Sequence, residues 1–253
     1  MGGVRDKNVL DIGCAYGGYT IESRRRGATV AYGVDVNPQF IAFAEANLND
    51  DGEDIRSGCK FLCCDMTSEK SSVLPKNYFN MLLVNDVFEH VYDTTRLMQI
   101  IDRVSAADCT LYFQIPNGLH FFDFVEREPH YFEYGQSFLE PGYCSYKDVF
   151  YRRWEYYAAL FKYFGFGKVQ MMNPVYSGSI NDCRQEVMAK FNHTEKELKE
   201  KFNDNTDMAN LILHKLQDMK SEMIFDLSEM NTEALDFKYL TGFWTGVAVK
   251  CVS

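Results

Sequence analysis

The chain has 253 residues, of which 46% are apolar, and its formal net charge is −10. This length and apolar content predict one sizeable domain with additions. Because the chain is acidic and has no long run of Lys or Arg, binding to nucleic acid is not expected. No apolar run is long enough to span a membrane, and no signal peptide precedes the first predicted strand. We therefore expect a cytoplasmic protein without membrane contact.

A strand, a glycine-rich turn and a helix are predicted at the start of the chain. An apolar strand at residues 9–12 leads into a turn with Gly13, Gly17 and Gly18, and a second apolar strand ends at Asp35. Glycines let a backbone turn tightly and approach a ligand, and the first N–H groups of the next helix are free to bind one. A carboxylate at the end of the second strand can accept both hydroxyls of a ribose. This unit predicts a nucleotide-binding site.

Two residues distinguish the cofactor classes that use such a unit. Ala15 stands where the dinucleotide fingerprint G-x-G-x-x-G has its middle glycine, and Asp11 lies on the strand before the turn. A pyrophosphate would gain nothing from Asp11, whereas a cofactor with an ammonium and a sulfonium would. The pattern D-x-G-x-(G/A)-x-G, followed by Asp35, resembles motif I and the next acidic motif of class I S-adenosylmethionine (SAM)-dependent methyltransferases.

Three later strands extend this resemblance. The apolar run 61–64 is closed by Asp65 and Met66, and further apolar runs open the segments 79–91 and 111–117. The resemblance implies that Asp65 bonds the adenine amino group and that Met66 lies against the ring. The end of the segment 79–91 resembles the D-V-L-E-H-V sequence found in methyltransferases akin to the ubiquinone-biosynthesis and glycan-associated enzymes.

The resemblance implies an α/β fold with a Rossmann-like, doubly wound, mostly parallel seven-stranded sheet whose last strand is antiparallel. Helices are expected after Asn37-Pro38 and after Asp93 or Thr94, because these residues are good helix caps. The implied cofactor is SAM, with S-adenosylhomocysteine (SAH) as its product. The residues expected to bind it are Asp11, Gly13, Cys14, Ala15, Gly17, Asp35, Val36, Asp65, Met66, Asn85, Asp86 and Val87.

An aromatic-rich insertion near 118–146 is expected to choose the substrate. Loops that follow strand ends in this fold face the cofactor, so the segment is predicted to line the acceptor site as a lid. The alternative is that its aromatic residues form only a small core of their own. The Pro116-Asn117 pair and the later Glu128-Pro-His130 resemble an arrangement in methyltransferases found with polysaccharide and glycoside biosynthesis genes. Rings and carboxylates also suit a sugar.

Three histidines are candidate catalytic bases, because an imidazole titrates near neutral pH. His130 is the first candidate, and His90 and His120 follow; His90 could instead orient its loop against the cofactor. The insertion's histidines and acids could in principle bind a divalent metal, but Pro129 argues against the regular helix that their spacing would need. No metal is expected.

A second, helical insertion is predicted near 173–241, before a last strand at 243–252. Thr194-Glu-Lys-Glu197 reads as a capping box, and an apolar stripe runs from Met208 to Met219. Packing within the chain is the expected role of that stripe, and capping of the site or formation of a homodimer is the weaker alternative. Asn173-Pro-Val-Tyr176 resembles the N-P-P-Y motif of amino-group methyltransferases but lies at the wrong place in the order of strands.

The whole chain, 1–253, is therefore predicted to be one class I methyltransferase domain with two insertions. The leading hypothesis is O-methylation of a sugar, a glycan or another small hydroxylated metabolite. Methylation of nitrogen or carbon stays open. A SAM-binding regulatory or scaffold domain of a larger biosynthetic protein is the rival, and a nicotinamide-dependent dehydrogenase is a distant third. The helices that usually precede the first strand in this family would then come from a longer parent chain or from other segments. The eight cysteines are expected to be reduced core residues.

Overall fold

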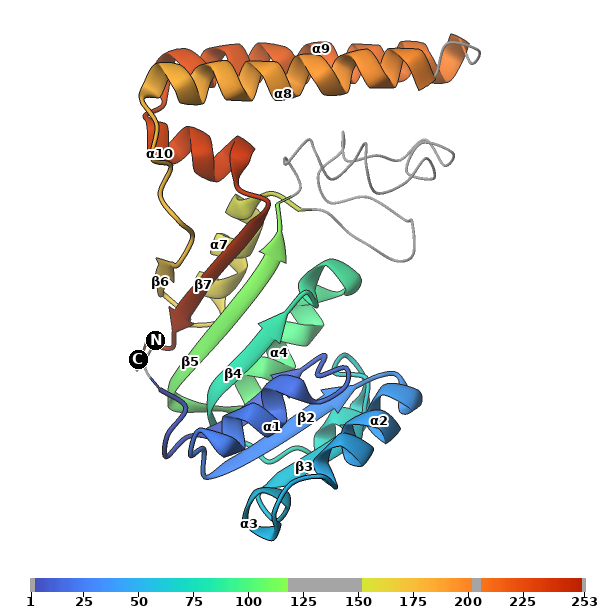
Figure 1. The fold of residues 1–253 in the computed structure, drawn as a ribbon, viewed down its shortest axis with the longest axis vertical. Helices are drawn as coiled ribbons and strands as arrows, with labels where there is room; N and C mark the ends of the chain where they lie inside the picture. Colours follow the sequence, from blue (N-terminus) through green and yellow to red (C-terminus); the bar gives the residue numbers. More distant parts are fainter. Residues whose placement is uncertain (1–2, 118–151, 202–205, 252–253) are drawn as a thin grey trace. The chain divides into compact units, whose positions relative to one another are not determined.

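A computed structural model describes residues 3–117, 152–201 and 206–251. Seven strands form one sheet in the order β3-β2-β1-β4-β5-β7-β6 (Figure 1). Neighbouring strands from β3 to β5 run parallel, and β6 pairs antiparallel with β7. The strands are β1 (Asn8–Ile12), β2 (Val30–Asp35), β3 (Cys59–Cys63), β4 (Phe79–Asn85), β5 (Ser105–Pro116), β6 (Lys168–Met171) and β7 (Phe243–Val249). The predicted mostly parallel sheet with an antiparallel last strand is confirmed.

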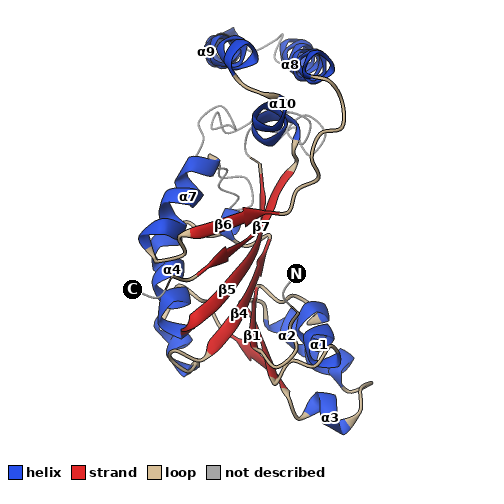
Figure 2. Ribbon diagram, turned by 90° about the vertical axis from the view of Figure 1, so that its left-hand side faces the viewer, coloured by secondary structure: helices blue, strands red, loops and turns tan. Residues whose placement is uncertain are grey.

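Helices cover both faces of this sheet. Figure 2 shows α1, α2 and α3 on one face and α4 and α7 on the other. The helices and helical turns between β1 and β6 are α1 (Gly18–Arg25), α2 (Pro38–Leu48), α3 (Glu53–Arg56), η1 (Glu69–Val73), η2 (Phe88–His90), α4 (Thr94–Val104) and α7 (Trp154–Tyr163). Because the parallel strands all end at one edge, the loops from β1, β2, β3 and β4 meet there.

The caps predicted for two of these helices are present. Asn37 accepts a hydrogen bond from the Gln39 N–H at 2.9 Å, with Pro38 as the first residue of α2. Asp93, rather than Thr94, caps α4 through the Arg96 N–H at 2.8 Å. A side-chain acceptor at this position satisfies an N–H that the helix itself leaves unpaired.

The side chains of β5 alternate between a buried face of the sheet and a partly exposed face. Leu111, Phe113 and Ile115 are fully buried, and the ring of Phe113 lies 5.1 Å from that of Phe161 on α7. Tyr112 and Gln114 alternate with them and are only partly buried. Since side chains of a strand alternate between faces, these two residues lie on the face that carries α1.

Strand β3 is less buried than the sequence suggested. It is an edge strand, and within it only Phe61 is buried, whereas Cys63 is exposed. The expectation that the cysteines are core residues was therefore wrong for Cys63. Cys251 is also exposed, and all the cysteines in the described part of the chain are free thiols.

The chain divides into two compact units, and the second comprises residues 116–154 and 173–244. Its helical segments are α8 (Ile180–Lys201), α9 (Thr206–Glu229), α10 (Thr232–Leu235) and the π-helical turn η4 (Asp236–Leu240). This confirms the predicted helical character of the second insertion. The predicted lid near 118–146 lies outside the described residues. Most side chains of the predicted apolar stripe on α9 lie outside them as well.

The predicted capping box at Thr194 was wrong. Thr194 is buried within α8, which begins 14 residues earlier at Ile180. The helix is instead preceded by Ser179, whose Oγ accepts the Asp182 N–H at 3.2 Å while Asp182 accepts the Ser179 N–H at 3.0 Å. This reciprocal pair is the capping box of α8.

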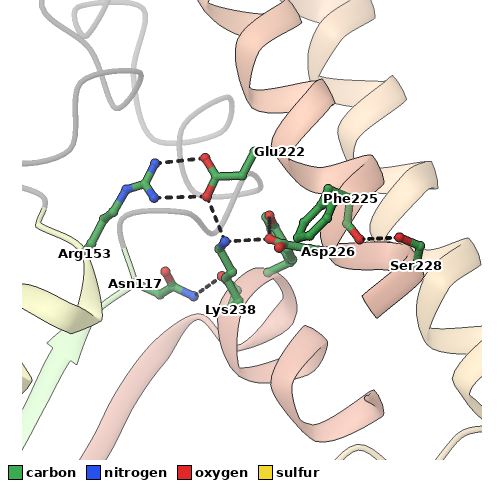
Figure 3. A network of polar contacts seen from close by, with 8 residues as sticks. Asn117, Arg153, Glu222, Phe225, Asp226, Ser228 and Lys238 are labelled. Carbon is green, nitrogen blue, oxygen red and sulfur yellow. Dashed lines mark hydrogen bonds and ion pairs between the residues drawn. The ribbon is translucent and has the colours of Figure 1, made fainter. Parts of the chain in front are cut away.

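A network of charged side chains ties α9 to η4 and to Arg153 (Figure 3). Glu222 accepts two hydrogen bonds from Arg153, at 3.0 and 3.2 Å, and one from Lys238 at 2.8 Å. Asp226 is buried and accepts from Lys238 at 2.5 Å and from the Tyr239 hydroxyl at 2.6 Å. Chiefly through its bonds to Arg153, the network lowers the pKa of Glu222 to about 2.

Asn117 completes the same unit. Its buried amide donates to the backbone carbonyls of Thr241, Lys238 and Phe237, at 2.8, 3.1 and 3.4 Å. These carbonyls lie at the end of η4, where helical backbone acceptors would otherwise be unpaired. The amide of Asn117, half of the predicted Pro-Asn motif, is thus used inside the fold.

Replacing Lys238 should weaken the second unit. In Lys238→Met the buried carboxylate of Asp226 loses its cation, so we expect the free energy of unfolding to fall by about 3 kcal/mol. The control is Lys199→Met, which removes an exposed pair with Glu195 and should cost under about 0.5 kcal/mol. Chemical denaturation followed by circular dichroism measures both. Equal losses in the two variants would contradict the role given to the network.

Candidate functional site

The turn between β1 and α1 has the left-handed backbone that its glycines predict. Gly13, Ala15 and Gly17 have φ angles of 72°, 45° and 79°. A Cβ on Gly13 would lie 2.5 Å from Cγ2 of Val87, and one on Gly17 would lie 2.6 Å from the Phe61 ring. At these two positions the close approach requires glycine.

Asp35 at the end of β2 holds this turn in place. Its Oδ2 accepts the backbone N–H of Ala15 at 3.0 Å, and its Oδ1 accepts the N–H of Asn37 at 2.9 Å. The first bond gives a physical reason for the left-handed Ala15, which lacks the freedom of glycine. A carboxylate has about four acceptor positions, so Asp35 can still accept the hydroxyls of a ribose.

Asp11 lies beneath the first turn of α1. It is 2% exposed, and its Oδ2 accepts the hydroxyl of Thr20, which is itself fully buried, at 2.8 Å. Burial raises the pKa of Asp11 to about 6, although the side-chain and backbone hydrogen bonds from Thr20 oppose the rise. Asp11 is thus a carboxylate that a nearby cation would strongly favour in its charged form.

The β3 loop presents the residues predicted to hold an adenine. Asp65 is exposed, and its Oδ1 accepts the backbone N–H and the hydroxyl of Thr67 at 2.7 and 2.8 Å. Neither bond uses Oδ2. Met66 is buried, whereas Val36 after β2 is 66% exposed. Val36 therefore offers the more accessible apolar surface.

The end of β4 carries two polar side chains in unusual settings. The amide oxygen of Asn85 is buried and has no hydrogen-bond partner among the described residues. Asp86 has a left-handed φ of 51°, donates its N–H to the Gln114 carbonyl and accepts from the Gln114 side chain at 3.2 Å. Strained backbone of this kind is often found at functional sites.

His90 is the one proposed catalytic residue that the structure describes. Its side chain is 53% exposed and lies on η2, with Nε2 at 3.9 Å from Oε1 of the buried Glu89. The other two candidates, His120 and His130, lie outside the described residues. The structure thus places one candidate base in the loop after β4.

The predicted cofactor residues fall on one edge of the sheet. Those from the β1 turn are joined to Asp35 by a hydrogen bond and to Val87 by close packing at Gly13. A turn without room for Cβ atoms, a ribose acceptor at Asp35 and an acid under the helix start fit SAM. When bound, SAM supplies an electrophilic methyl carbon on a sulfonium.

Two contacts in this site were not found by sequence reasoning. Thr20 holds Asp11, and Gln114 holds Asp86. Thr20 sits in the first turn of the helix that the glycines open, so its proximity to the turn was a usable signal. Gln114 lies 28 residues from Asp86, and only the strand register brings the two together.

The chain contains no candidate metal cluster and no candidate membrane span within its described residues. No group of three or more His, Cys, Asp or Glu side chains there could hold a metal ion. None of the helices described is both long and apolar enough to cross a bilayer.

The strand order and the turn after β1 define a class I SAM-dependent methyltransferase domain. A model of the family described as "Methyltransferase domain" matches residues 4–140, more than half of the chain. The chain belongs to that family, and SAM is the methyl donor of its domain. The finer resemblance to ubiquinone-biosynthesis and glycan-associated enzymes stays a prediction.

Known proteins are similar to this chain mainly in fold. A SAM-dependent methyltransferase from Mesorhizobium loti is 12% identical, with a TM-score of 0.56, over 99% of this chain and 94% of that one. Phosphoethanolamine N-methyltransferase 2 of Haemonchus contortus, solved with phosphomonomethylethanolamine and SAH, is 16% identical, with a TM-score of 0.54, over 98% of this chain. An uncharacterized Haemophilus influenzae protein is 27% identical over 110 residues, 44% of this chain. These matches span only 49% of the Haemonchus chain and 42% of the Haemophilus protein.

Adding one methyl group should have different effects at two neighbouring glycines of the turn. In Gly17→Ala the new Cβ meets Phe61 and Ala44 on a strained backbone, so we expect a loss of roughly 1–3 kcal/mol in stability and weaker SAM binding. Gly18→Ala is the matched control, because a Cβ there has nothing within 4 Å. Denaturation and calorimetry measure the two effects. A Gly17→Ala protein that matches Gly18→Ala in both would contradict the predicted close approach.

Binding of SAM should depend on pH through Asp11. With a pKa of about 6, Asp11 is largely neutral at pH 5 and charged at pH 7. If it faces the cationic end of SAM, affinity rises over this range and binding at pH 6 releases protons. The stability of the protein without ligand changes in the opposite direction. Because burial raises the pKa of Asp11, the contribution of this group to the free energy of unfolding falls as pH rises from about 4 to 6.

Calorimetry in buffers of different ionisation enthalpy measures the released protons, and Asp11→Asn should abolish both the release and the rise in affinity. Affinity that stays level from pH 5 to 7 in the natural protein would remove Asp11 from the cofactor site.

Proposed function

We propose that this protein transfers a methyl group from SAM to a hydroxyl of a small molecule, either a sugar or glycan or another hydroxylated metabolite. One observation carries the proposal. The glycine turn, which Asp35 holds by a hydrogen bond, packs closely against the end of β4, where Gly13 lies next to Val87. A donor held in that turn is presented to the loop that carries His90 and Asp86. Methyl transfer needs little more than alignment of donor and acceptor in a dry site.

The chain's own residues then have two tasks. The acceptor must be held with its oxygen in line with the bond that breaks between sulfur and methyl. As the new C–O bond forms, the hydroxyl proton must pass to a base. We assign this role to one of His90, His120 and His130, of which His90 is exposed beside a buried carboxylate.

Two alternative functions fit the same site. One is methylation of a nitrogen or carbon atom, and the other is SAM binding without methyl transfer, in a regulatory or scaffold role. The Haemonchus enzyme of similar fold is an N-methyltransferase by its name, which keeps the nitrogen alternative in view. Fold alone does not choose between these acceptors. A homodimer or a larger parent chain stays a prediction as well.

The cofactor assignment is tested by replacing Asp35. Asp35→Ala should weaken SAM and SAH binding by about 2 kcal/mol, because it removes charge-assisted bonds to ribose and the support of the Ala15 N–H. Asp50→Ala, which removes an exposed acid, is the control. Calorimetry with SAM, SAH and NADH measures the effect. Unchanged affinity in Asp35→Ala would exclude that role, and binding of NADH without SAM would exclude the function itself.

A further inference from the structure

One residue of the glycine turn is held from outside the sheet. Tyr16 lies between Ala15 and Gly17, whose φ angles of 45° and 79° are both left-handed. Such backbone costs conformational free energy, above all at a residue with a Cβ such as Ala15, and it persists only where the surroundings fix it. Asp35 fixes the turn at the N–H of Ala15. The next residue, Tyr16, is fixed by α2.

Asn47, in the last turn of α2, binds the backbone of Tyr16. Its Nδ2 donates to the carbonyl oxygen of Tyr16 at 3.0 Å. The next N–H along the chain, that of Gly17, donates to the carbonyl oxygen of Cys14 at 2.8 Å. Because the Tyr16 carbonyl and the Gly17 N–H belong to one peptide plane, the two bonds hold that plane at both ends. Asp35 and Asn47 therefore fix two peptide planes of the same turn.

The side chain of Tyr16 contacts the same helix. Its ring centroid lies 4.9 Å from that of Phe40 and 5.8 Å from that of Phe43. Phe40, Phe43 and Asn47 have the i, i+3, i+7 spacing that places residues on one face of a helix. One face of α2 thus contacts both the ring and the carbonyl of Tyr16. Tyr16 and Phe43 are 53% and 57% exposed, so these contacts lie at the surface and not in the core.

We propose that Asn47 is a positioning residue for the cofactor, which keeps the glycine turn in its binding conformation before SAM binds. A turn that is already ordered does not have to be ordered by the ligand, so the affinity for the ligand is higher. Asn47 lies outside the residues predicted to contact SAM, and it acts through the backbone of Tyr16. The inference rests on the proposed function, because it assigns a role in SAM binding.

The first test replaces the hydrogen-bond donor of Asn47 by an acceptor. Asn47→Asp keeps the size of the side chain but places a carboxylate beside the Tyr16 carbonyl, so the hydrogen bond is lost and the two oxygens repel each other. We expect the SAH affinity, measured by calorimetry, to fall about tenfold. Asn49→Asp is the matched control, because it adds the same charge at an exposed side chain just after α2. Its SAH affinity should stay within about twofold of that of the natural protein.

Hydrogen exchange without ligand distinguishes a positioning role from a general loss of stability. The amides of Ala15 and Gly17 both donate within the site, to Asp35 and to the Cys14 carbonyl. In Asn47→Asp they should exchange about tenfold faster, and saturation with SAH should restore their protection. The reference is the buried amide of Ala31 in β2, which donates to the Gly58 carbonyl at 2.9 Å and should exchange at the natural rate.

Three results would count against this role of Asn47. Equal SAH affinities in Asn47→Asp and Asn49→Asp overturn the inference and leave the proposed function intact. Exchange that rises at Ala31 as much as at Ala15 and Gly17 also overturns it, because Asn47 would then stabilise the whole domain. A natural protein that does not bind SAH loses the proposed function and the inference together.

Discussion

The rest of the site depends on the carboxylate of Asp35. It accepts hydrogen bonds from the N–H of Ala15, in the turn after β1, and from the N–H of Asn37, before α2. The sheet brings these two loops to the same edge, and Asp35 links them to each other. The turn can then keep left-handed residues on both sides of Cys14, and α1 can start where Gly17 and Gly18 place it. A single acid thus fixes the backbone that must approach a cofactor, while it keeps lone pairs for the ribose.

Burial separates the roles of acids that the sequence alone shows as equivalent. Asp11 is enclosed by the sheet and by Thr20, and burial raises its pKa to about 6, so its charge depends on what binds nearby. Asp86 is exposed, and its carboxylate accepts a hydrogen bond from the amide of Gln114. Asp11 therefore suits a group whose charge responds to a cation bound nearby.

Much of the fold could be predicted, because its signals are local. The caps at Asn37 and Asp93 follow from side chains that bond their own helix, and the strands follow from apolar runs with acids at their ends. The errors came where a local pattern was ambiguous. Thr194 with Glu197 has the spacing of a capping box but lies inside a long helix, and Cys63 lies on an edge strand that its apolar neighbours made look central.

Some contacts that shape the site cannot be predicted from local sequence patterns. The bond from Gln114 to Asp86 depends on the register of β4 with β5, and the partial exposure of Tyr112 depends on which face of the sheet α1 covers. The glycine turn after β1 can be read from one stretch of sequence, because a tight turn needs glycine whatever surrounds it. Side chains at the strand ends are positioned by the sheet, but the fold alone does not fix which residues stand there, so the acceptor cannot be read from the fold.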